Sequence, residues 1–430
     1  MPITACRVSS TFDLFITKSW ILDTTTTTAA MLTPASNTLG VVSIPPRDPL
    51  HILFCGTDDF SCVSLQALYD EMQSPRSSIA SVQVLVRPAK PTGRGLKAIV
   101  YSPVKELAQR LGLQVHERDT FTGWSPVDIE TNKINMVVAV SFGLFVPPRI
   151  LRSCKYGGLN VHPSLLPDLH GASPIEHAIL LGRQSTGVTV QTLHEKTFDG
   201  GRRLLAAPSS DSVSCVSIDT EVFTVDRRTT AKKLRERLAP VGARLLVEVI
   251  QRGLFLPLPR TGADEQEASS EGAPAPKLSK ADREIQFTST YTTATAVDRQ
   301  MRALGPVWTH VVGMKKKKQV RKRLILEEME LAALPLLDKA MENTDTEMDT
   351  LTFQHGGRDV VLPVVVDGTD LLLPLGGPEG TDNNPNALRL RQVKIEGFQT
   401  SPAATALGSF VQKQPASCVS WDVVTRAADK

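Results

Sequence analysis

The sequence lacks any long uninterrupted apolar run. No stretch of about 18 consecutive apolar residues, the length that a transmembrane helix needs, occurs in the chain. Hydrophobic residues make up 41% of the 430 residues and charged residues 22%, which is the balance of a globular protein. We therefore expect a soluble chain without a membrane partner.

Cysteines are few and show no pairing pattern. The chain has 6 of them, with no Cys-x-x-Cys pair and no histidine at zinc spacing. Disulfide scaffolds and structural zinc sites depend on such spacing. The pattern excludes a disulfide framework and predicts a reducing compartment and no metal site.

The net charge is small, but the cations are unevenly distributed. A total of +3 does not by itself indicate nucleic acid. One short run nevertheless holds Lys315, Lys316, Lys317, Lys318, Arg321, Lys322 and Arg323. A solvated basic face is the simpler interpretation, but a run of this density beside short strands also suits a surface that follows phosphates.

Residues 1–48 form an extension rich in Ser and Thr. Mitochondrial presequences are usually rich in Ser and Arg and poor in acids. This extension contains Arg7 but also Asp13 and Asp23, so the match is partial. A mitochondrial presequence and a disordered extension both stay open, and Met31 offers a second start.

An alternation of strand and helix patterns begins at His51. Residues 51–55 have the pattern of a buried strand, and residues 60–72 that of an amphipathic helix. Further strands are expected at 82–86, 135–140, 159–161 and 187–193, and further helices at 102–111 and 173–181. The order and the apolar strands predict an α/β fold with a doubly wound, mostly parallel sheet.

The second half of the chain shows a different pattern. Leu234, Leu238 and Leu245 belong to a helical repeat, which Pro240 should kink or split. We expect a catalytic domain over 49–255, a linker over 256–285 and a smaller β-barrel (OB-like) domain over 286–415. The barrel prediction rests on short strand patterns at 324–326, 359–366, 371–375 and 388–393.

Polar residues interrupt the apolar strand pattern at 159–161. Asn160 and His162 lie two apart, so alternation puts both on one face, at the sheet edge where α/β folds bind ligands. An amide donates to an oxyanion, an imidazole moves protons, and a nearby carboxylate such as Asp199 would orient the ring. As a pattern alone, Asn-x-His is more often a satisfied polar pair, and Asp before Gly-Gly is usually a turn residue.

Four motifs strengthen the catalytic interpretation. They are Asn160–Pro167, Gly171–Ile175, Gly187–Val190 and Phe198–Gly201. Together they closely resemble the signature of the folate-dependent formyltransferases. The resemblance implies that Asn160, His162 and Asp199 form a catalytic trio on a doubly wound sheet. It also implies that Asn160 donates to the oxyanion, that His162 stabilises it or relays a proton, and that Asp199 orients His162.

Other stretches indicate a branch of this family. Phe54–Phe60, Pro91–Lys97, Ser102–Lys105, Ser141–Pro147 and Lys277–Lys280 are similar to methionyl-tRNA formyltransferases. The spacing that ends in Phe198-Asp199 resembles the mitochondrial type more than the bacterial one. The similarity runs from about His51 to Phe287. It implies 10-formyltetrahydrofolate as the donor and methionyl initiator tRNA as the acceptor, giving N-formylmethionyl-tRNA for organellar translation initiation. We expect a monomer in the mitochondrial matrix, with a cytoplasmic location as the alternative.

The resemblance assigns further residues to binding. Those expected at the folate are Ser164, Leu165, Leu166, Pro167, Phe142, Gly143 and Leu144. At the tRNA, the resemblance implies Arg94 and Lys97, and the density of positive charge adds Lys315, Lys316, Lys317, Lys318 and Arg321. Without the resemblance, the loop with Arg94 and Lys97 would simply be flexible and basic.

The chain departs from the family pattern at a few positions. The family usually has basic residues where this chain has Asp168 and His170, and Arg202 and Arg203 replace an acidic or apolar continuation.

Three alternative functions stay open. The acceptor could be a small-molecule amine, such as glycinamide ribonucleotide or a nucleotide sugar. The formyl group could be lost to water, or the chain could be a catalytically impaired tRNA-binding relative.

Overall fold

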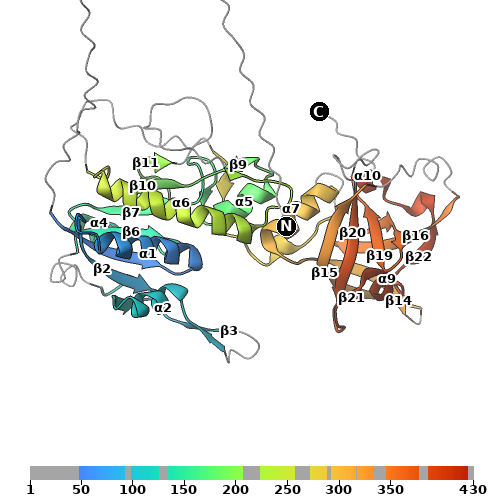
Figure 1. The fold of residues 1–430 in the computed structure, drawn as a ribbon. Coiled ribbons are helices and arrows are strands. Elements are labelled where there is room, and N and C mark those ends of the chain that lie inside the picture. The colour runs from blue at the N-terminus through green and yellow to red at the C-terminus, as the bar shows by residue number, and fades with distance from the viewer. Residues whose placement is uncertain are drawn as a thin grey trace, which may run out of the picture. The chain divides into compact units, whose positions relative to one another are not determined.

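The computed structural model describes residues 48–92, 98–124, 134–206, 223–256, 272–287, 292–315, 317–333, 345–376 and 386–424. Figure 1 shows the arrangement of their helices and strands. None of the helices in these ranges is long and apolar enough to cross a membrane.

A seven-stranded sheet organises the first half of the chain, in the order β11-β10-β7-β6-β1-β2-β5. Its strands are β1 (Leu50–Gly56), β2 (Ile79–Val86), β5 (Gln114–Glu117), β6 (Met136–Val140), β7 (Gly158–His162), β10 (Thr189–Thr192) and β11 (Arg203–Ala206). The five strands from β5 to β7 are parallel, whereas β10 and β11 are antiparallel. This confirms the predicted doubly wound, mostly parallel sheet.

Helices and short strand pairs surround this sheet. The helices are α1 (Asp59–Met72), α2 (Pro103–Arg110), α4 (Pro148–Ser153), α5 (Pro174–Leu180) and α6 (Ala231–Gln251). The short strands are β3 (Lys90–Thr92), β4 (Ala98–Val100), β8 (His170–Gly171), β9 (Ser185–Thr186), β12 (Phe223–Thr224) and β13 (Pro274–Ala275). A 3-10 turn, η1 (Ala281–Arg283), follows β13.

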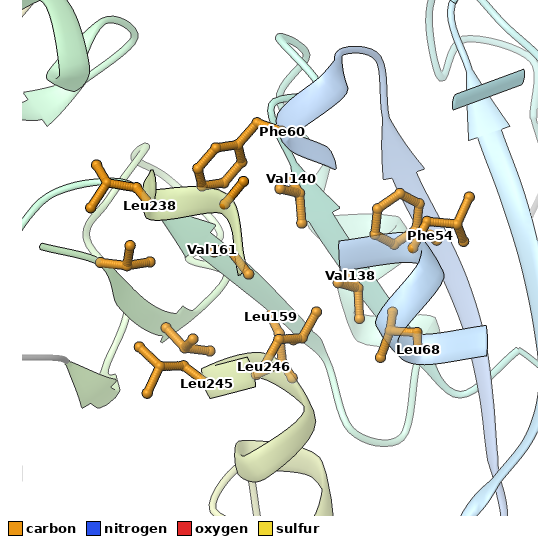
Figure 2. Close-up of a cluster of buried hydrophobic side chains, with 14 of the residues drawn as sticks. Phe54, Phe60, Leu68, Val138, Val140, Leu159, Val161, Leu238, Leu245 and Leu246 are labelled. Atoms are coloured by element: carbon orange, nitrogen blue, oxygen red, sulfur yellow. The ribbon is translucent and has the colours of Figure 1, made fainter. Parts of the chain in front are cut away.

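Both faces of the central strands are buried, because alternate residues enter different cores. Phe54 and Val138 face α1 and α6, where they join Phe60 and Leu246 (Figure 2). Their neighbours along β1 and β6 pack on the other face with residues of α4. Covering on both sides explains why these strands are apolar throughout instead of alternating.

Helix α6 is continuous over 21 residues, with Pro240 inside it. Of the two expectations for Pro240, a kink or a split, the split is therefore wrong. Pro240 lies on the exposed face, while the opposite face is buried against the sheet. Gly242 permits this close approach, since a Cβ there would lie 2.7 Å from Val161 Cγ1. Burial of the apolar face offsets the hydrogen bond that proline removes.

The last third of the chain forms a curled antiparallel sheet, as predicted for the smaller domain (Figure 1). Its order is β17-β16-β14-β15-β20-β19-β18, with β21 on β20 and β22 on β16. The strands are β14 (Val307–Lys315), β15 (Lys318–Ala332), β16 (Glu347–His355), β17 (Arg358–Pro363), β18 (Val365–Asp367), β19 (Asp370–Pro374), β20 (Ala387–Ile395), β21 (Ser401–Pro402) and β22 (Gln412–Pro415).

Several strands of this sheet differ from the expected segments. Strands β14 and β16 were not predicted, and the single strand expected at 359–366 is two strands, β17 and β18. The elements that accompany the sheet are α7 (Ala294–Leu304), α9 (Ala403–Leu407), η2 (Ala416–Cys418) and α10 (Trp421–Val424). The sheet encloses its own apolar core, in which Phe287 and Phe353 are in ring contact at 4.6 Å between centroids.

Replacing Pro240 with Ala should stabilise the protein. The substitution restores an N–H donor to the interior of α6 without removing a buried contact, and we expect a gain in unfolding free energy of about 1–3 kcal/mol. Thermal unfolding followed by circular dichroism measures the change. Pro148→Ala is the control, because Pro148 occupies the first turn of α4, where proline is tolerated. A melting temperature below that of the unaltered chain would contradict the expectation.

Candidate functional site

Neighbouring strands and one turn bring the three predicted catalytic residues together. Asn160 and His162 lie on β7, and Asp199 lies in the turn between β10 and β11. His162 Nδ1 is 3.2 Å from Asp199 Oδ1, and both side chains are almost fully buried. The separation of 37 positions in the chain is closed by the antiparallel pairing of β7 with β10.

Gln191 connects Asn160 to Asp199 and was not predicted from the sequence. It lies directly opposite Asn160 in the register of β7 and β10. Its Nε2 donates to Asp199 Oδ1 at 2.8 Å and to Asn160 Oδ1 at 3.3 Å. Gln191 is only 1% exposed. A polar amide within a buried strand was therefore the one sequence feature that could have pointed to it. Recognising its partners required the strand register.

The two ring nitrogens of His162 both face hydrogen-bond acceptors. Nε2 lies 3.0 Å from the carbonyl oxygen of Leu169, and Nδ1 faces the Asp199 carboxylate. A carbonyl and an ionised carboxylate can only accept, so each contact needs a hydrogen on the ring. Both are satisfied together when the ring is the imidazolium cation. Asp199 then lies where it would be the counter-charge of that cation.

Asp199 is held in place by several donors. Burial alone would raise the pKa of its carboxyl. The hydrogen bond and charge of His162, the Gly171 N–H at 2.8 Å and the Gln191 amide outweigh that effect and hold this pKa below its ordinary value. Its backbone is left-handed at φ 57°, a conformation that Asp tolerates in turns.

The turn around Asp199 also depends on a glycine. A Cβ at Gly201 would lie 1.7 Å from the carbonyl oxygen of Thr192. No side chain fits there, so the Gly-Gly pair after Asp199 sets the path of the turn.

Asn160 keeps one donor available. Its Nδ2 donates to the carbonyl oxygen of Ala139 at 3.0 Å, while its Oδ1 accepts from Gln191. These two contacts fix the orientation of the amide. Because an amide nitrogen carries two hydrogens, the second remains free for a ligand oxygen.

The residues predicted to bind folate lie in loops beside the trio. Ser164, Leu165, Leu166 and Pro167 follow β7 directly, and Phe142, Gly143 and Leu144 follow β6, the parallel neighbour of β7. The side chains of Ser164, Leu166 and Phe142 are buried, and Ser164 Oγ donates to the Asp168 carbonyl at 2.7 Å. The side chains of Ser164, Leu166 and Phe142 therefore pack inside the loops. Those of Leu144, Leu165 and Pro167 are partly exposed.

An aromatic pair at the rim was not predicted. The rings of Phe145 and Phe198 meet edge to face, with centroids 5.2 Å apart. Phe198 directly precedes Asp199 and is 65% exposed. The pair gives the site an apolar surface next to its buried charges.

Four of the seven residues predicted to contact tRNA lie within the described parts of the chain. Arg94, Lys97 and Lys316 lie outside the described residues. Lys315 ends β14, and Lys317 lies in the turn to β15. Lys318 and Arg321 lie on β15, where Arg321 donates to His310 Nδ1 at 2.9 Å.

A neighbouring cation stacks on an aromatic ring of the same sheet. The Arg323 guanidinium lies 4.1 Å from the centre of the Trp308 ring.

Among the described residues, no cluster of His, Cys, Asp and Glu is arranged to hold a metal ion.

The sequence is similar to formyl-transferring proteins. The family model described as formyl transferase matches residues 50–250. A methionyl-tRNA formyltransferase of Chromohalobacter salexigens is 34% identical over 272 residues, covering 61% of this chain and 74% of that protein. A mitochondrial methionyl-tRNA formyltransferase of Saccharomyces cerevisiae is 35% identical over 243 residues, covering 51% of this chain and 60% of that protein.

Solved structures give a weaker likeness. A 4-N formyltransferase from Francisella tularensis aligns with a TM-score of 0.44 at 14% identity, over 64% of this chain and 97% of that one. The segment matched by the family model contains Asn160, His162 and Asp199. The similarity to the C. salexigens protein shows that the chain is one of the formyl transferases. Within this class, it belongs to the methionyl-tRNA formyltransferase family.

The lowered pKa of Asp199 should appear in the acid dependence of stability. A carboxyl whose pKa falls on folding stabilises the protein above its unfolded pKa, and this contribution is lost as the pH drops through the folded value. In urea unfolding between about pH 5 and pH 3, we expect Asp199→Asn to lose less unfolding free energy than the unaltered chain. The same substitution at Asp70, which is exposed on α1, is the control. Parallel curves for Asp199→Asn and the unaltered chain would refute this role of the carboxylate.

Proposed function

We propose that this chain transfers the formyl group of 10-formyltetrahydrofolate to the amino group of methionyl initiator tRNA. The observation that carries the proposal is the convergence of Asn160, His162 and Asp199 at one sheet edge, within the family-matched segment. The names of the relatives from C. salexigens and S. cerevisiae indicate the acceptor.

The site supplies what the reaction needs. The amine nitrogen forms a bond to the formyl carbon, the carbonyl oxygen becomes an oxyanion, and the amine loses a proton. The bond from that carbon to the folate nitrogen then breaks as this nitrogen gains a proton. The free Nδ2 hydrogen of Asn160 donates to the oxyanion, and the His162 ring, when protonated, stabilises it. Asp199 holds the ring in place.

The rim suits a flat donor molecule. Phe198 and Phe145 offer an exposed aromatic surface immediately before Asp199. A pterin ring stacks well on such a surface, because aromatic pairs favour offset or edge-to-face contact. Leu144 and Leu165 add apolar contacts from the loops after β6 and β7. We assign the folate to this rim, with no metal taking part.

The charge pattern of β15 suits a polyanionic acceptor. Its first half carries Lys318, Arg321, Lys322 and Arg323, whereas its second half is acidic. In the acidic half, Glu330 is paired with arginines of β20. Within the described part of the chain, Lys317 and Lys318 form no ion pair, so their charges remain available to phosphates.

We place the reaction in the mitochondrial matrix, where its product would serve translation initiation. The S. cerevisiae relative is named as mitochondrial, and residues 1–48 resemble a presequence in part. N-terminal sequencing of the mature protein tests this directly. A mature chain that retains residues 1–48 would contradict import by cleavage.

The acceptor is tested by a formylation assay. Charged initiator tRNA is offered alongside uncharged tRNA and glycinamide ribonucleotide, with 10-formyltetrahydrofolate as donor. Formylation of charged tRNA alone supports the proposal. Three outcomes would contradict it, and each supports one of the alternative functions: formylation of the ribonucleotide, loss of the formyl group to water, and tRNA binding without turnover.

Removing the free donor of Asn160 should slow the reaction. The loss of one oxyanion donor costs about 3–4 kcal/mol of transition-state stabilisation, so Asn160→Ala should lower kcat about a hundredfold to a thousandfold. Steady-state formylation of charged tRNA measures the loss. Asn135→Ala is the matched control, because Asn135 bonds the backbone of Pro49 and His51 just before β6. Near-normal turnover by Asn160→Ala would remove its assigned role.

Reversing one charge on β15 should weaken tRNA binding. Each phosphate contact contributes about one unit to the slope of log affinity against log salt. We therefore expect Lys318→Glu to lower tRNA affinity and to flatten that slope. Lys413→Glu makes the same charge change at an exposed position on β22 and should leave both nearly unchanged. Equal effects of the two substitutions would show that only net charge matters.

A further inference from the structure

Asp168 stands where the family usually has a basic residue, and it joins two segments far apart in sequence. Its Oδ1 accepts the backbone N–H of Ala273 at 3.0 Å and a guanidinium N–H of Arg183 at 2.9 Å. The ion pair is exposed, with 37% and 41% of the two side chains accessible, so its own contribution is small. The contact to Ala273 is therefore the more consequential of the two.

Residues 272–275, here called the strap, lie tightly on the loop that contains Asp168. In the strap, β13 pairs in parallel with β8, and Ser173 donates its N–H to the carbonyl of Ala275 at 3.0 Å. A Cβ at Gly272 would lie 2.3 Å from the carbonyl oxygen of Pro167. The strap thus fixes the path of residues 167–171.

This loop supplies a hydrogen-bond partner to both His162 and Asp199. Leu169, which follows Asp168, presents its carbonyl to His162 Nε2 at 3.0 Å. Gly171 donates its N–H to Asp199 Oδ2 at 2.8 Å. A shift of the loop would therefore remove a hydrogen-bond partner from the ring and one from the carboxylate together.

We propose that Asp168 is a positioning residue for the formyl transfer. By accepting the Ala273 N–H, it holds the strap against the loop, and the loop in turn holds the His162 ring and Asp199. The proposal rests on the proposed function for its kinetic consequence. Its structural consequence, the order of the His162 ring, is independent of the substrate.

The test compares substitutions of matched shape. Asp168→Asn keeps an oxygen that accepts from Ala273 but loses the charge, whereas Asp168→Leu has the same shape and no acceptor. We expect Asp168→Leu to lower kcat about tenfold to a hundredfold, with the KM for charged tRNA changed by less than about twofold. Asp168→Asn should stay within about threefold of the unaltered kcat.

A proton NMR signal reports on the ring directly. The hydrogen on His162 Nε2 gives a downfield resonance, identified by its absence from His162→Gln. It should broaden or vanish in Asp168→Leu and persist in Asp168→Asn. Glu195→Gln, which breaks the exposed ion pair with Arg152, should change neither kcat nor this resonance.

The outcomes separate the two proposals. Equal kcat values and equal resonances for Asp168→Leu and Asp168→Asn would overturn the positioning role. If the unaltered chain transfers no formyl group, the proposed function fails, and the resonances alone decide the role of Asp168. If circular dichroism shows that Asp168→Leu is unfolded, Asp168→Ala replaces it, since it lacks the acceptor and adds no apolar bulk.

Discussion

The antiparallel pairing of β7 with β10 is the constraint on which the site depends. Reversal at β10 places Gln191 opposite Asn160 and leads into the turn that carries Asp199. The Gln191 amide joins Asn160 to Asp199 across this pairing. The other partner of the His162 ring, the Leu169 carbonyl, comes from the loop after β7.

Periodicity was sufficient for part of this site. Alternation along one strand placed Asn160 and His162 on the same face, and apolar strands without alternation indicated a sheet covered on both sides. Asp199 was assigned through a family motif, because nothing local distinguishes it from an ordinary turn residue. Gln191 escaped prediction since its partners follow from the register between strands, which a single segment does not encode.

Packing decided the features that local rules described wrongly. Pro240 carries a helix-breaking signal, yet the burial of the opposite face of α6 outweighs it. Asp168 and Ala273 are separated by 105 positions in sequence. Within the segment expected to be a linker, 256–285, residues 274 and 275 pair with β8. Contacts of this range depend on the whole chain, so the composition of one segment does not reveal them.

The exposed ring of Phe198 has a thermodynamic consequence. An aromatic face left in water orders the solvent around it, and its removal from water on binding lowers the heat capacity of the system. A flat ligand that covers Phe198 and Phe145 would therefore bind with an enthalpy that becomes more favourable as the temperature rises. The buried charges beside these rings do not share this temperature dependence. Calorimetry at several temperatures would thus distinguish binding at the rim from binding at the trio.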